Sequence, residues 1–134
     1  MTINKDLHNQ VSVGVAIALT AVADGEDVVG AVIDRQGSEG LEIIFQVGAY
    51  TDGSVTPLIE ESDNNSDYTA VAGANLTNAE ASAALSAAGV SSIGYVGFKR
   101  YVRATAVTAA GSTLSVGASF VKFSLRLQGT VNPS

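Results

Sequence analysis

The sequence predicts an all-β fold: an antiparallel two-sheet sandwich, jelly-roll-like, with one short Ala-rich helix. Three observations support this prediction. Short apolar segments with period-2 alternation recur along the chain, polar turns rich in Gly, Asp and Asn separate them, and Ala and Val dominate the apolar residues. With 134 residues, 46% of them hydrophobic, the chain can form one domain with a packed core. About eight strands joined by short turns favour a jelly roll.

We divide the chain into three parts. Residues 1–10 are polar and unpatterned, which predicts a flexible N-terminal arm. Residues 11–128 contain the strand patterns and form the single β-sandwich domain, and residues 129–134 form a C-terminal tail.

The first predicted strand covers residues 11–19, where large side chains alternate. With the following Ala21-Val22-Ala23, this segment also resembles the apolar region of a secretory signal peptide. The preceding residues include both Lys5 and Asp6 and therefore lack the positive charge of such a peptide. We predict a strand, and we expect no membrane partner, because no apolar segment approaches the roughly 20 residues that span a bilayer.

The clearest strand pattern lies in residues 40–71. Large apolar residues alternate along its first half, and Asp52-Gly53 then leads into a second extended run, residues 55–61. Asp-Gly between two such runs indicates a hairpin, because Gly accepts the positive φ that the turn needs. A polar turn at 62–67 returns the chain through 68–71, which predicts a three-stranded antiparallel meander.

The predicted helix covers about residues 78–88. Thr77 can act as the N-cap, with Glu80 completing a capping box. The segment is rich in Ala, and Gly89 follows as a helix-ending residue.

The last predicted strand runs from Thr113 to about Gln128. Its large side chains change phase near Ser119 and Phe120. Because a slip of one residue turns every side chain to the other face, we predict a β-bulge or bend there.

Charge is unevenly distributed along the chain. The net charge of −6 argues against nucleic acid as a partner. All 13 acidic residues lie at or before Glu80, and five of the seven basic residues lie at or after Lys99. The two halves can balance each other within the chain, with Glu42 or Glu60 facing Arg100 or Arg103, or they can meet on neighbouring subunits. The candidate residues for charge-mediated subunit contacts are Glu42, Glu60, Glu61, Arg100 and Arg103.

The residue types argue against catalysis. The chain has no cysteine, and its single histidine, His8, lies in the polar arm without a partner that the sequence fixes nearby. Glu60 and Glu61 are adjacent on a predicted strand, so they point to opposite faces and cannot act together as an acid and a base. We therefore predict no enzyme, no catalytic residue and no cofactor.

One segment partly matches a calcium loop. Asp63, Asn65 and Asp67 occupy positions 1, 3 and 5 of that pattern. Tyr68 stands where the pattern needs Gly, and Ala74 stands where it needs Glu. We interpret the segment as an ordinary polar turn and predict no metal site.

Two segments resemble a known family. VGAYTDGSVTPLIEESDNNSDYTAV (residues 47–71) and GYVGFKRYVR (residues 94–103) resemble small head decoration, or capsid cement, proteins of tailed bacteriophages, such as those of a Bordetella podophage. The resemblance covers roughly residues 33–121. It implies a jelly-roll-like protein, made in the bacterial cytoplasm, that binds the capsid exterior and bridges neighbouring major capsid proteins of the HK97-like type. Self-association as a dimer or trimer is also expected.

The alternative is a carbohydrate-binding jelly-roll module or a phage adhesin domain. Such a module should present a cluster of exposed aromatic side chains. The sequence has no Trp, so the candidates are Tyr50, Tyr68, Tyr95 and Tyr101.

Overall fold

The computed structural model describes residues 11–22, 25–38, 40–78 and 84–123. The predicted arm with His8, the predicted tail (129–134) and the end of the last predicted strand (124–128) lie outside the described residues.

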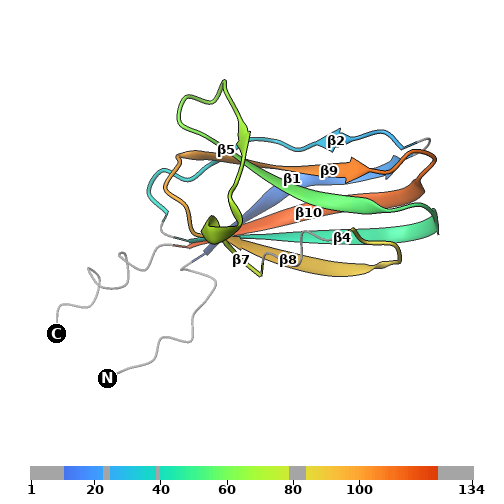
Figure 1. The fold of residues 1–134 in the computed structure, drawn as a ribbon. Helices are drawn as coiled ribbons and strands as arrows, with labels where there is room; N and C mark the ends of the chain where they lie inside the picture. The colour runs from blue at the N-terminus through green and yellow to red at the C-terminus, as the bar shows by residue number, and fades with distance from the viewer. Residues whose placement is uncertain (1–10, 23–24, 39, 79–83, 124–134) are drawn as a thin grey trace.

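The described chain forms two antiparallel sheets that pack face to face (Figure 1). In order across sheet A, the strands are β1 (Val11–Val22), β10 (Thr113–Phe123), β4 (Gly40–Asp52), β8 (Gly89–Tyr95) and β7 (Leu76–Thr77). In order across sheet B, they are β2 (Val28–Val29), β9 (Tyr101–Thr108), β5 (Val55–Ser62) and β6 (Thr69–Ala70), and β3 (Ile33–Asp34) also pairs with β9. The chain passes repeatedly between the sheets, as in a jelly roll. The predicted two-sheet, all-β sandwich is confirmed.

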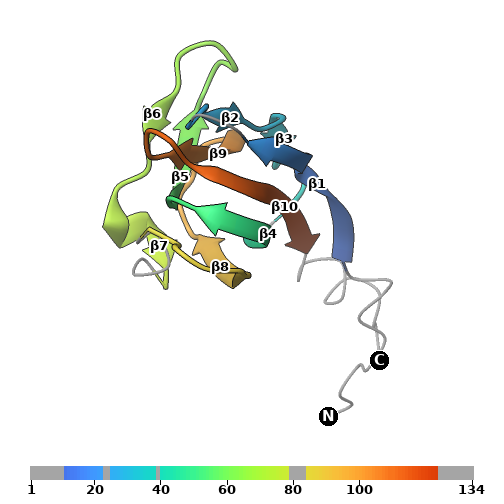
Figure 2. The same ribbon diagram turned by 90° about the vertical axis from the view of Figure 1, so that its right-hand side faces the viewer.

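The segment that also resembled a secretory region is strand β1, as predicted. It lies at the edge of sheet A and bends towards sheet B (Figure 2). Within the described ranges, no helix is long and apolar enough to cross a membrane.

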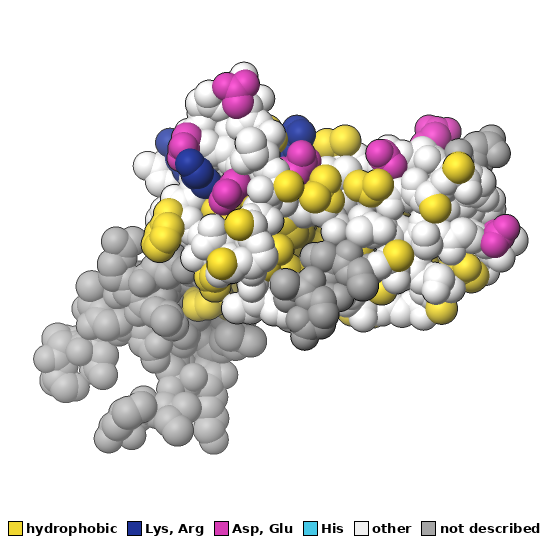
Figure 3. All heavy atoms as spheres, in the orientation of Figure 1, with side chains coloured by type: hydrophobic (Ala, Val, Ile, Leu, Met, Phe, Trp, Pro, Cys, Tyr) yellow, Lys and Arg dark blue, Asp and Glu magenta, His cyan; other side chains and the backbone are white. Residues whose placement is uncertain are grey.

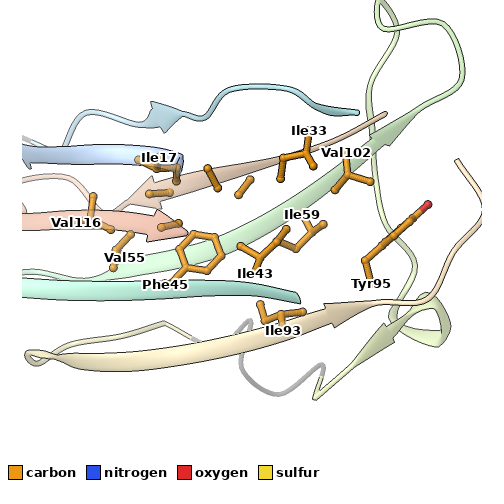
Figure 4. Packing of buried hydrophobic residues seen from close by; sticks show 14 of the residues in the cluster. Ile17, Ile33, Ile43, Phe45, Val55, Ile59, Ile93, Tyr95, Val102 and Val116 are labelled. Atoms are coloured by element: carbon orange, nitrogen blue, oxygen red, sulfur yellow. The ribbon is translucent and has the colours of Figure 1, made fainter. Parts of the chain in front are cut away.

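The hydrophobic core fills the space between the two sheets (Figure 4). Alternate residues of each long strand point inward, as the pleat requires. Ile43 and Phe45 of β4 are fully buried and face Val55 and Ile59 of β5 across this space. Tyr95 closes the core near the end of β8.

The first pairing of the predicted meander is wrong, because β4 and β5 lie in different sheets, whereas its second pairing, of β5 with β6, is present. β4 pairs with β10 and β8, whereas β5 pairs with β9 and β6. Gly53 has the expected positive φ of 92°, but the turn carries the chain across the sandwich and forms no hairpin. We call this crossing from β4 to β5 the arch. The buried Ser112 hydroxyl stabilises it, accepting a hydrogen bond from the Ser54 N–H (3.0 Å) and donating one to the Ser54 carbonyl (3.1 Å).

The predicted helix at 78–88 is also wrong in its described part. Asn78 has a positive φ of 61°, and residues 84–88 are not helical. Leu85 instead exchanges two backbone hydrogen bonds with Val55, of 2.7 and 2.9 Å, and packs against the core. This long-range pairing overrides the local helix propensity of the Ala-rich segment, because tertiary contacts commonly outweigh intrinsic propensity. Residues 79–83 lie outside the described residues, and the helical element nearby is a 3-10 turn, η2 (Gly73–Asn75).

The predicted irregularity near Ser119 and Phe120 is not in β10. This strand pairs with β4 without interruption from Val116 to Phe123. The extra residue lies in β1, where Val15 pairs with Ser119 and Ile17 with Ala118. The apolar side chains change phase in the sequence because the last outward positions of β10, Val121 and Phe123, are apolar too.

The arch between β4 and β5 gives a matched pair of stability predictions. Gly53→Ala is expected to lower the free energy of unfolding by about 2–5 kcal/mol, because the added Cβ would overlap Ser112 and the positive φ is strained. Gly37 has a similar φ of 83°, but a Cβ added there would meet no neighbouring atom within 4 Å. Gly37→Ala is therefore expected to lower the free energy of unfolding by only about 1–2 kcal/mol. Urea unfolding of both variants measures the difference, and equal losses would contradict the account of the arch.

Candidate functional site

The loop that partly matched a calcium site is held by its own side chains. The Asn64 side-chain carbonyl accepts hydrogen bonds from the Ser62 hydroxyl and from the Ser66 and Asp67 N–H groups, each 2.9 Å long. Asp63 pairs with Lys99. The described residues contain no group of three or more acidic, His or Cys side chains that could hold a metal ion. The loop is a structured turn.

Glu60 and Glu61 point to opposite faces of β5, as their spacing predicts. Glu60 pairs with Arg103 on the outer face of sheet B (3.0 Å) and accepts a hydrogen bond from the Thr105 hydroxyl. Glu61 accepts a hydrogen bond of 2.6 Å from the Tyr95 hydroxyl, which reaches it from sheet A. The two carboxylates serve separate contacts.

The Lys and Arg side chains visible in Figure 3 lie towards the end of the molecule where the β5–β6 loop projects, whereas Asp and Glu side chains also lie at the opposite end. The predicted pair of Glu60 and Arg103 is present within the chain, with Arg103 also stacked on the Tyr68 ring. Arg100 instead makes two hydrogen bonds of 2.9 Å to Asp34. The Arg100 guanidinium holds the pKa of the Asp34 carboxyl well below its usual range. A role for these residues between subunits stays a prediction.

Tyr95 joins the two sheets at this end and fixes the following loop. Its hydroxyl donates to Glu61 and accepts from the Lys99 N–H at 3.0 Å, and Arg35 lies over its ring at 4.8 Å. Burial of the phenol, together with its hydrogen bond to Glu61, raises the pKa of Tyr95 to about 12. The folded state therefore favours the neutral, protonated form of the Tyr95 hydroxyl.

The loop of residues 96–99 presents an exposed aromatic ring on a fixed backbone. The Val96 N–H donates to the Asn75 carbonyl (2.8 Å), and the Gly97 carbonyl accepts from Arg35 (2.9 Å). Between these fixed points, Phe98 is 94% exposed. We call residues 96–99 the Phe98 loop.

The outward side of sheet A forms the second unusual surface. Its rows place Val13 beside Val121 and Glu42, and Val15 beside Ser119 and Ile44. We call this surface, which also includes Leu19, Gln46, Val90 and Gly117, the outer face of sheet A. Leu19 is 77% exposed, Val13 67% and Val90 66%. Glu42 is the single charged residue of this set, and no ion pair forms on it in the described part of the chain.

A shallow hollow of about 250 Å³ lies in this face, over β1, β10 and β4. The residues that line it are Val15, Ile17, Leu19, Ile44, Gln46, Gly117, Ala118 and Ser119. Gly117 contributes no side chain, and two register shifts, each with one extra residue in β1, lie beside it. The hollow is uncharged and mostly apolar.

Neither surface was predicted from the sequence, although the sequence contains signals for them. An antiparallel strand with one solvated face should alternate apolar and polar residues. The end of β10 instead carries large apolar residues in both phases, which indicates an apolar outer face. In β1 the large residues alternate with small or polar ones, and Val13, Val15 and Leu19 of this set lie exposed on the outer face. Phe98 stands out as an aromatic residue inside a short Gly-Phe-Lys turn.

No family model matches the sequence, and no curated protein matches it. Among solved structures, the chain is similar to the PBSX exported protein XepA, with 20% identity, a TM-score of 0.63, and coverage of 84% of this chain and 37% of that one. It is also similar to the SPBc2 prophage-derived protein YomS, with 12% identity, a TM-score of 0.53, and coverage of 85% and 93%. The chain thus spans well under half of XepA. At these identities the likeness shows a shared fold.

The raised pKa of Tyr95 makes a prediction about stability at high pH. Because the folded state favours the neutral phenol, the contribution of Tyr95 is complete below the unfolded pKa of about 10 and is lost as pH rises towards about 12. Tyr95→Phe removes the hydroxyl, so it is expected to cost about 1–3 kcal/mol at pH 7. Urea unfolding of both proteins at several pH values should show this difference shrinking above pH 10. A constant difference would contradict the assignment.

Proposed function

We propose that this chain is a structural protein of a bacteriophage virion that binds the outer surface of the capsid and bridges neighbouring major capsid proteins of the HK97-like type. The observation that carries the proposal is the outer face of sheet A. An exposed and almost uncharged apolar surface on a sheet suits burial against another protein.

The family resemblance supports this proposal through two segments that the fold brings together. Residues 47–71 and 94–103 are far apart in the sequence, but four side-chain contacts join them. These contacts are Glu60 with Arg103, Arg103 with the Tyr68 ring, Glu61 with Tyr95, and Asp63 with Lys99. Residues 60–68 of the first segment and residues 95–103 of the second therefore meet at one end of the molecule. The fold shared with two prophage-derived proteins agrees with a phage origin.

Lattice binding explains how a modest surface can be sufficient. Each copy would bury a limited apolar area against the shell. A copy that touches two capsid proteins at once makes its second contact at a high effective concentration, which strengthens the whole association without new types of contact.

The carbohydrate-binding alternative finds less support in the described part of the chain. Tyr95 is buried, and Tyr50, Tyr68 and Tyr101 are half-buried. The Tyr50 hydroxyl donates to the Gly53 carbonyl, and an arginine stacks on each of Tyr68 and Tyr101. These rings form no exposed cluster of the kind that stacks on sugars.

Capsid binding can be tested with purified protein and undecorated tailed-phage capsids. Stoichiometric co-sedimentation, with density at lattice positions in electron micrographs, is the expected result. Val13→Glu is expected to weaken binding at least about tenfold, because it places an unpaired charge in the contact. Val29→Glu, an equivalent change at a 58% exposed position on sheet B, serves as the control. Retention on a glycan array without capsid binding would favour the carbohydrate-binding alternative.

A further inference from the structure

We infer that copies of this chain assemble head to tail, with Phe98 of one copy seated in the hollow on the outer face of sheet A of the next copy. The inference rests on the proposed function only in treating this face as a protein contact. It needs no capsid.

The Phe98 loop has the properties of a preorganised anchor. Phe98 is the most exposed large hydrophobic side chain in the described ranges. Hydrogen bonds from Val96 N–H, from Arg35 to Gly97 and from Lys99 N–H already fix the backbone on both sides of it. Burying this ring in a partner would therefore gain apolar contact with little loss of backbone freedom.

The hollow has the size and chemistry to receive this ring. An apolar cavity of about 150 Å³ is enough to hold a benzene molecule. The hollow measures about 250 Å³, and Val15, Leu19 and Ile44 supply apolar walls. A phenylalanine ring entering from outside would cover these exposed side chains and would meet no charge among the residues that line the hollow.

Charge complementarity favours a second copy as the occupant. Glu42 lies two residues before Ile44 on the same face of β4, about 7 Å along the strand, and it makes no ion pair in the described chain. Two cations follow the ring directly in the sequence, Lys99 in the Phe98 loop and Arg100 just after it, and Arg100 pairs with Asp34. The Lys99–Asp63 pair is exposed and therefore weak, so Lys99 can turn to Glu42 of the next copy.

The two surfaces lie on different parts of the molecule, which determines the symmetry of the contact. The Phe98 loop is at the end of the sandwich, after β8, whereas the hollow is on the flat side of sheet A. One copy therefore donates its ring to the next and receives a ring from the one before it. Such contacts build a closed ring or an open chain of copies.

Two variants remove one half of the contact each. Phe98→Ala removes the ring, and Ser119→Phe fills the hollow from an exposed strand position where an aromatic residue is well tolerated. In sedimentation velocity, the mass of the wild-type protein is expected to rise with concentration. Each variant alone should associate at least tenfold more weakly. Val29→Ala, another exposed apolar position, should behave as wild type, and circular dichroism checks that all variants fold.

Mixing the variants gives the decisive measurement. Phe98→Ala retains the hollow and Ser119→Phe retains the ring, so an equimolar mixture is expected to form one-to-one pairs and nothing larger. A monomeric mixture, association of either variant alone at wild-type strength, or a wild-type protein that stays monomeric would overturn the inference. If the wild type does not self-associate but binds capsids, the proposed function stands without this inference. If the wild type self-associates but does not bind capsids, the inference stands and the proposed function fails.

The charged contact has a separate signature. Glu42→Gln is expected to weaken self-association about two- to fivefold at low salt. The difference between this variant and the wild type should fade at high salt, because ions screen an exposed pair. No effect of Glu42→Gln at low salt would remove Glu42 from the contact.

Discussion

Close packing of the two inner sheet faces is the interaction on which the rest of the structure depends. Several of the fully buried positions are alanines, which let the sheets approach each other around the larger Phe45 and Ile43. These alanines are Ala16, Ala104 and Ala106. Side chains therefore fill the interior along the strands, and recognition must take place on the outer surfaces and at the loops.

The charges contribute to this arrangement by holding one end of the sandwich rigid. Arg35, Lys99, Arg100 and Arg103 each bind an acidic side chain, a ring or a carbonyl within the chain. These contacts join the loops at this end of the sandwich to the two sheets. The outer face of sheet A, in contrast, is almost free of charge. The molecule thus separates a polar, ordered end from an apolar side.

Sequence reasoning recovered the strands but not their partners. Period-2 alternation identified β4 and β5, yet the Asp52-Gly53 turn specifies a local conformation and not the sheet that each strand joins. The helix prediction failed because propensity could not reveal the pairing of Leu85 with Val55. The pairing of opposite charges predicted the contact of Glu60 with Arg103, which are cross-strand neighbours. It did not predict the contact of Asp34 with Arg100, which precedes β9 and lies beside Asp34 only because β3 pairs with that strand.

The pairing of Val11 with Phe123 has a consequence for engineering. These first and last described residues are Cα partners in adjacent antiparallel strands, so their Cα atoms lie about 5 Å apart. A peptide fused before Val11 and another fused after Phe123 would both leave from one corner of the sandwich. A short linker joining these two positions would turn β1 and β10 into a hairpin. New termini could then be opened at the exposed Gln36-Gly37 turn, which makes the fold suited to circular permutation.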